Sequence, residues 1–173
     1  MNANNANKNK FWQVTFNKLP TSVDMLSALS EANLKEPHYA AALLIPTLCI
    51  WGTDQNVALE MINFLKGPQG LSTYEKQFIN ERLRGKSYLP FSYFQGSSPE
   101  NGYKVSSPYA VNISTVPTSF DEDGYAKLYL KSSGSDSPRP VVLRKKDSTG
   151  QWFLWDQMLL SDIRIPVSED PWA

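Results

Sequence analysis

The sequence GQWFLWDQMLL, residues 150–160, decides the fold class that we predict for this chain. Side chains of a β-strand alternate between its two faces, so Trp152 and Leu154 would point one way and Phe153 and Trp155 the other. Both sets are large and apolar. A strand of this kind needs cover on both sides, and we therefore expect it at the centre of a sheet. Alternatively, the same rings would form an aromatic platform for a ligand.

Other segments show the alternation expected of strands that pair with residues 150–160. They are Tyr109–Val116, Tyr125–Lys131 and Val141–Lys146. Turn-forming residues separate these segments, among them the acidic sequence DEDG at 121–124. Phe11–Phe16 alternates loosely and would add either a short edge strand or a packed arm. The pattern predicts an antiparallel sheet of four to five strands.

The residues before Lys86 carry helix signals instead. Thr21 is expected to cap the first helix, and Pro37 suits the first position of the second. The second helix is apolar almost all round, which predicts that it is buried. Asp54 is a plausible cap for a third helix, and the capping box Ser72-Thr-Tyr-Glu75 begins a fourth. The inner face of this fourth helix is predicted to carry Tyr74, Phe78, Ile79 and Leu83.

These patterns together predict an α+β protein, with about four N-terminal helices packed on a C-terminal antiparallel sheet. The amphipathic helices and the two-sided strand need each other's apolar faces, so we expect a single domain over residues 11–173. The Asn-rich residues 1–10 are predicted to be a disordered lead-in.

Charge and hydropathy exclude several classes of function. Lys+Arg and Asp+Glu both number 17, so nothing in the net charge of +0 favours nucleic acid or an anionic membrane. The longest apolar run, about residues 39–51, is too short to span a bilayer, and the N-terminus has no apolar core of a signal peptide. We expect a cytoplasmic protein that binds neither nucleic acid nor a membrane.

The chain has a single cysteine, Cys49, and a single histidine, His38. A catalytic thiol needs a base to activate it, and a metal site made from His and Cys needs several such ligands. Cys49 lies within an apolar run and is best explained as a small buried side chain. We therefore expect no metal and no cofactor, and these shortages weigh against an enzyme.

The candidate binding residues lie mainly in the aromatic segment between residues 88 and 103. Tyrosine and phenylalanine among small polar residues are typical of recognition surfaces, although the same rings would equally close the open edge of the core. Arg139 and Asp156, near or within the predicted strands, are added because they could contact a ligand. The full set is Tyr88, Phe91, Tyr93, Phe94, Tyr103, Arg139 and Asp156.

Charged residues near the last strands allow two interpretations. Internal ion pairs would hold the C-terminal segment, and alternatively a polar catalytic cluster would use Asp156 as acid or base. The residues concerned are Arg139, Arg144, Asp156, Asp162 and Arg164. In the tail, Trp172 is expected to dock on the body because an exposed terminal tryptophan gains nothing.

Two hypotheses for function follow. The first is a non-enzymatic binding or adaptor module that acts through protein contacts, because the chain has abundant aromatic residues and lacks nucleophile, metal and phosphate-loop signatures. The second is a small-molecule or enzymatic pocket between the helices and the sheet. A deep, closed pocket with ionisable side chains would favour the second, and a solid core with a flat aromatic surface the first.

Five motifs give the chain a resemblance to known sequences. They are GPQGLSTYEKQF (67–78), YLPFSYF (88–94), DSPRPVVLR (136–144), WFLWDQ (152–157) and EDPWA (169–173). Together they resemble a small family of bacterial proteins of unknown function, found largely in Gram-positive anaerobes. The resemblance covers about residue 19 to the end and implies no activity, ligand or catalytic residue. In outline, helices followed by a meander ending in a Gly-x-Trp strand are also similar to the nuclear-transport-factor-like cone, an alternative fold.

Overall fold

Helix α2, Pro37–Trp51, lies at the centre of the protein and is buried on all sides. The computed structural model describes residues 9–173, and within this helix every residue except Tyr39 and Ile50 is buried. The helix is apolar around its whole circumference, and its one interior hydroxyl, Thr47 Oγ1, donates to the carbonyl of Leu43 at 2.9 Å. The sequence prediction of a buried helix that begins at Pro37 is confirmed.

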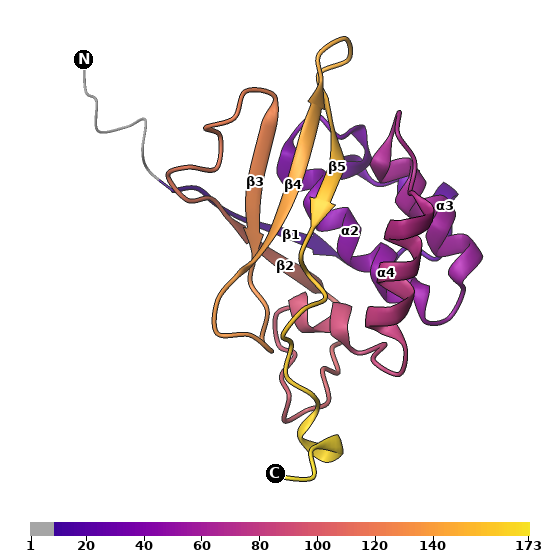
Figure 1. Ribbon diagram of the computed structural model, residues 1–173, viewed down its shortest axis with the longest axis vertical. Coiled ribbons are helices and arrows are strands. Elements are labelled where there is room, and N and C mark those ends of the chain that lie inside the picture. Colours follow the sequence, from indigo (N-terminus) through magenta and orange to yellow (C-terminus); the bar gives the residue numbers. More distant parts are fainter. Residues whose placement is uncertain (1–8) are drawn as a thin grey trace.

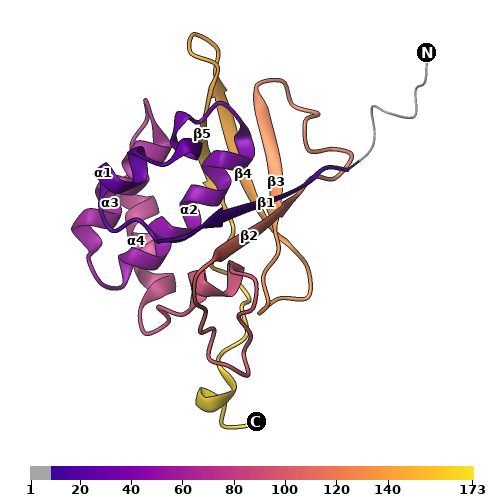
Figure 2. The same ribbon diagram turned by 180° about the vertical axis from the view of Figure 1, so that it is seen from behind.

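Within residues 9–173, five strands form an antiparallel meander in the order β1-β2-β3-β4-β5. Their bounds are Phe11–Phe16, Tyr109–Ser114, Tyr125–Leu130, Arg139–Lys146 and Gln151–Gln157. Strands β2 and β3 pair only over two residue pairs, Ile113 with Leu130 and Ser114 with Tyr129. Because this contact is short, β1 and β2 cross the direction of β3–β5, and α2 lies between the two parts of the sheet (Figures 1 and 2). Helix α2 contacts all five strands.

The remaining helices lie on the same side of the sheet as α2 (Figure 2). They are α1 (Val23–Ser27), the 3₁₀ turn η2 (Ser30–Asn33), α3 (Gln55–Lys66) and α4 (Thr73–Leu83). The α+β class is confirmed, with the four α-helices before β2–β5 in the chain and β1 ahead of them. None of the helices in residues 9–173 is long and apolar enough to cross a membrane.

Two local helix predictions are wrong and two are confirmed. The first helix is capped by Ser22, whose Oγ accepts from the Met25 N–H at 3.1 Å, and Thr21 lies one residue too early to do so. Tyr74, predicted to face inward, is 76% exposed because it lies in the first turn of α4, on the outer side. The cap at Asp54 and the capping box of Ser72 and Glu75 both form as expected.

Strand β5 lies at the edge of the sheet, so the prediction that it is central is wrong. Only Leu154 is fully buried on it, and Trp155 is 39% exposed. The register between β4 and β5 shifts at Val142/Leu143, which leaves Trp155 without a cross-strand partner. The cover for Phe153 comes from the α3–α4 connection, where a Cβ at Gly67 would clash with its ring. Helices that wrap around the edge therefore replace the neighbouring strand that the apolar pattern indicated.

The C-terminal tail docks only as far as Val167, whose N–H donates to the carbonyl of Pro99 at 2.9 Å. Beyond it the chain leaves the body (Figure 1), and Trp172 is 93% exposed. The prediction that Trp172 docks is wrong, because the short turn η4 (Val167–Glu169) directs the last residues into solvent. The predicted lead-in, residues 1–10, falls mostly outside the described residues.

His38 lies at the start of α2, where its ring stacks on Trp12 of β1 with centroids 4.3 Å apart. Its Nδ1 is buried and has no hydrogen-bond partner within residues 9–173. Burial lowers the pKa of His38, Glu36 opposes this effect, and Lys10 adds to it. The neutral imidazole is therefore the form that the fold favours.

We predict that Leu44→Ala will lower the free energy of unfolding by about 2–5 kcal/mol, because Leu44 is fully buried on α2 and its loss leaves a cavity. Urea unfolding followed by circular dichroism measures this. Trp172→Ala removes a larger side chain from an exposed site and should change stability by less than about 0.5 kcal/mol. Equal effects of the two substitutions would contradict the packing described here.

We also predict that His38 makes stability depend on pH. Since its folded pKa lies below the unfolded value of 6.5, the unfolded chain binds the proton first as pH falls. The stabilising contribution is complete above pH 6.5 and is lost below it, down to the folded pKa. Urea unfolding at pH 7.5 and pH 5.5 should show a larger loss for the native protein than for His38→Gln. An identical loss in both proteins would show that His38 has no such effect.

Candidate functional site

An open groove runs between the outer edge of β5 and the corner where α3 leads into α4. We call it the β5 groove. It consists of two hollows that share Lys66, Leu154 and Trp155. The apolar hollow, about 270 Å³, includes Leu71, Tyr74, Phe78, Ile79 and Met158 in its lining. The basic hollow, about 390 Å³, includes Pro68, Arg144, Lys145, Lys146 and Phe153.

Exposed apolar side chains gather in this groove. Tyr74 is 76% exposed, Met158 57% and Trp155 39%. The capping box fixes the first turn of α4 and so places Tyr74 on the rim, while the irregular register of β5 turns Trp155 outward. Large apolar side chains that share one concave surface are typical of interaction sites.

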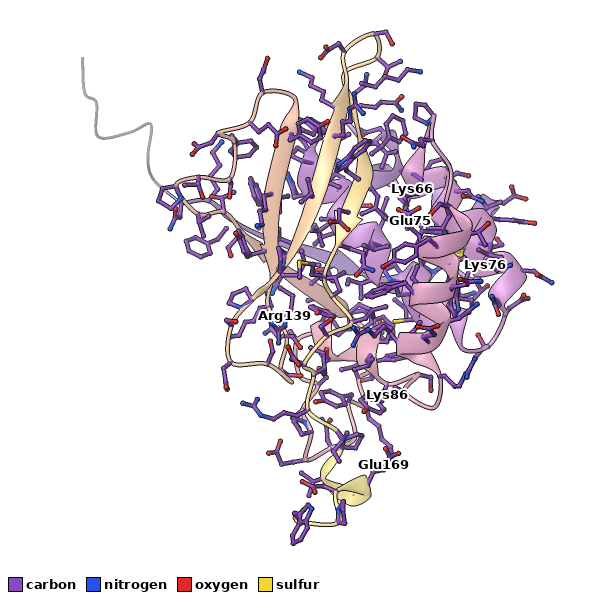
Figure 3. The ribbon with its side chains drawn as sticks, in the orientation of Figure 1. Lys66, Glu75, Lys76, Lys86, Arg139 and Glu169 are labelled. Carbon is purple, nitrogen blue, oxygen red and sulfur yellow. The ribbon has the colours of Figure 1, made fainter. Side chains whose placement is uncertain are left out.

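An ion pair lies in the groove wall, between the end of α3 and the start of α4. Lys66 Nζ donates to Glu75 Oε1 at 2.6 Å, and Figure 3 shows the two side chains together beside β5. The Lys66 side chain is 7% exposed, and the Glu75 side chain 34%. Glu75 Oε2 also accepts from the Ser72 N–H at 2.8 Å. The pair therefore holds the α3–α4 corner at a fixed position against β5.

The surroundings of Glu75 favour its ionised form. Burial raises the pKa of this carboxyl, but the hydrogen bonds from Lys66 and Ser72 lower it by more, and the net shift is downward. Both charges of the pair are thus engaged with each other.

Arg144 stands between two aromatic rings at the basic end of the groove. Its guanidinium carbon lies 4.7 Å from the ring centre of Trp155 and 5.6 Å from that of Tyr125. The two rings meet edge to face at 5.8 Å. Both rings contact the guanidinium, which has no carboxylate partner in the described part of the chain.

The aromatic residues predicted to bind a ligand lie mostly in the core. Tyr93, Phe94 and Tyr103 are buried, and Tyr88 and Phe91 are half-buried. The Tyr93 hydroxyl donates to the carbonyl of Leu159, and the Tyr103 hydroxyl to that of Arg164. Their position supports the alternative left open by the sequence, that these rings close the core. A binding role for them stays a prediction.

Burial has a chemical consequence for these hydroxyls. Burial raises the pKa of Tyr93 far above its ordinary value. Burial and the neighbouring Tyr88 raise the pKa of Tyr103 to about 12, although Arg164 acts to lower it. Both phenols are therefore neutral at physiological pH. Each acts as a donor that ties the aromatic segment to the chain after β5.

Asp156 and Arg139, the other predicted site residues, lie apart. Asp156 lines the β5 groove and accepts a hydrogen bond from the Gln157 N–H at 2.8 Å. Arg139 donates instead to the main-chain carbonyl of Asp162 at 3.0 Å, and its Nε is buried without a partner in residues 9–173. Of the residues expected to form ion pairs, Arg164 forms one, but with Asp136, which was not among the predicted partners.

Most of the groove was not predicted from the sequence. Trp155 was included only in the alternative of an aromatic platform, and Tyr74 was assigned to the inner face. The sequence does contain a signal that could have identified Lys66. This lysine is an isolated charge at the end of an apolar helical face, and it lies close in sequence to the capping box. No sequence signal places Arg144 on Trp155, because that contact depends on the irregular register of β5.

Other reactive groups lie away from the groove. Cys49 is buried in α2, and burial raises the pKa of its thiol well above the ordinary value. In the described part of the chain, no group of three or more His, Cys, Asp or Glu side chains is arranged to hold a metal ion.

We predict that Glu75→Gln will lower the free energy of unfolding by about 1–3 kcal/mol, because it leaves the buried Lys66 ammonium without its charged partner. Chemical unfolding at neutral pH measures this. Glu60→Gln, at an exposed position of α3, is the matched control and should have little effect. If the two variants are equally stable, the ion pair does not hold the corner.

Comparisons with known proteins give one match. No curated protein and no solved structure matched the chain. A family model described as a domain of unknown function (DUF6935) matches residues 18–167, which include α1 to α4, strands β2 to β5 and the whole β5 groove. The resemblance to a family of unknown function is thereby confirmed, and the chain belongs to the DUF6935 family.

Proposed function

We propose that this domain is a non-enzymatic binding module that holds a peptide segment of a protein partner in the β5 groove. The observation that carries the proposal is the gathering of Tyr74, Trp155 and Met158, all exposed, along one open groove. Exposed aromatic and methionine side chains in a concave surface are the common anchors of protein recognition.

The dimensions of the groove favour an extended segment. Its two hollows meet at Leu154 and Trp155, and together they are lined by the consecutive residues 153–158, the last five residues of β5 and Met158. At the usual rise of a strand this corresponds to about 17 Å, the length of about five extended residues. A compact small molecule would fill only one of the hollows.

The chemistry of the groove favours binding over catalysis. Lys66 and Glu75 neutralise each other, and Asp156 is exposed and bonded to its neighbour's main chain. A catalytic acid or base lies within hydrogen-bond reach of the proton that it transfers. The alternative, a small-molecule or enzymatic pocket, would require an enclosed cavity with such a group, whereas both hollows of this groove are open.

A selection from a phage-displayed library of random peptides will test the proposal. We expect the native domain to enrich a family of peptides, and Trp155→Ala and Tyr74→Ala to bind them at least about tenfold more weakly, as loss of a central anchor predicts. Phe11→Ala, which removes an exposed ring from β1 at the opposite edge of the sheet, is the control and should bind normally.

Two results would contradict the proposal. One is the absence of any enriched peptide from a correctly folded domain. The other is equal binding of enriched peptides by the native domain and both groove variants, which would place the binding surface elsewhere.

A further inference from the structure

We propose that the β5 groove selects peptides in which an acidic residue stands next to an apolar one, and that Arg144 binds the acidic side chain. This inference rests on the proposed function and specifies the chemistry of the partner. It follows from the geometry of Arg144 and from the separation of charge and apolar surface along the groove.

Arg144 is prepared for a carboxylate. The rings of Trp155 and Tyr125 hold its guanidinium, and among residues 9–173 no acceptor bonds to it and no acid pairs with it. Contact with the ring faces leaves the N–H groups of the guanidinium free for acceptors. A carboxylate matches that edge with two parallel hydrogen bonds.

Most of the charges around Arg144 are positive. Arg144, Lys145 and Lys146 all line the basic hollow, and Asp147 is the one acidic residue in that lining. Lys66, the remaining cation, is already neutralised by Glu75. An acidic side chain therefore gains attraction in this hollow, and a basic one is repelled.

The adjoining hollow has the opposite character. Leu71, Phe78, Ile79 and Met158 line it, and Asp156 supplies a negative charge. An apolar side chain would be buried there, while a second acidic residue would meet Asp156. Because the hollows meet at Leu154 and Trp155, residues one or two apart in an extended peptide reach both.

Fluorescence polarisation with a defined set of peptides tests this inference. The probes are labelled eight-residue peptides with a central Phe or Leu, flanked at successive positions by Glu, Gln or Lys. We expect the best Glu peptide to bind about tenfold more tightly than its Gln counterpart, and its affinity to fall as salt is raised.

Arg144→Gln should remove that preference, so that this variant binds the Glu and Gln peptides with equal affinity. Arg144→Lys, which keeps the charge but not the planar edge, should retain part of it. Arg84→Gln, at an exposed arginine at the other end of α4, is the control and should bind like the native domain. Circular dichroism confirms that each variant is folded.

The outcomes separate the two proposals. If Phe and Leu peptides bind through Trp155 but Glu and Gln peptides bind equally, the selectivity for acidic residues is refuted and the binding function stands. If no peptide binds, the binding function itself fails. If inorganic phosphate displaces the Glu peptide when the two are present at equal concentration, the site recognises anions in general. The inference of a peptide partner is then overturned.

Discussion

Burial of α2 is the constraint on which the rest of the structure depends. The helix contacts all five strands, so each element of the sheet obtains part of its apolar cover from one segment of 15 residues. The side chains of α2 that are exposed by 1% or less include Leu43, Leu44, Ile45 and Leu48. Side chains of this size contribute about 1.5–3 kcal/mol each when fully buried. A sheet joined by only two residue pairs between β2 and β3 keeps its curvature because α2 occupies its inner side.

The groove forms at β5, where the apolar cover of the sheet comes to its edge. At β5 no further strand pairs within residues 9–173, and the α3–α4 corner closes over Phe153 instead. The Lys66–Glu75 pair fixes this corner, and the bulged register of β5 sends Trp155 to the outside. A rigid corner facing an edge strand leaves a gap that side chains of the domain line without filling. The aromatic segment at residues 88–103 has the opposite role, since its rings fill the other end of the core.

Sequence patterns predicted the class of fold because they report what each residue needs locally. The capping box at Ser72 and the proline at the start of α2 both depend on nearby residues, and both were confirmed. Which distant segment covers an apolar side chain cannot be predicted from its neighbours in the sequence. Residues 150–160 require apolar neighbours, but whether a strand or a helix corner supplies them is decided by the topology. The same limit explains Trp172, whose apolar area suggested docking although no surface within residues 9–173 receives it.

The tryptophan side chains offer the most direct measurement of the central claim, that the β5 groove is the binding surface. The chain has five, and each indole N–H gives its own nitrogen–proton NMR signal. Trp155 lines the groove, whereas Trp12 stacks on His38, Trp51 donates to Asn80 at 2.8 Å, and Trp172 stands in the exposed tail. On addition of a selected peptide, the account predicts a shift of the Trp155 signal while those of Trp12, Trp51 and Trp172 stay in place. A shift of Trp172 with an unmoved Trp155 would contradict it and would make the C-terminal tail the binding element.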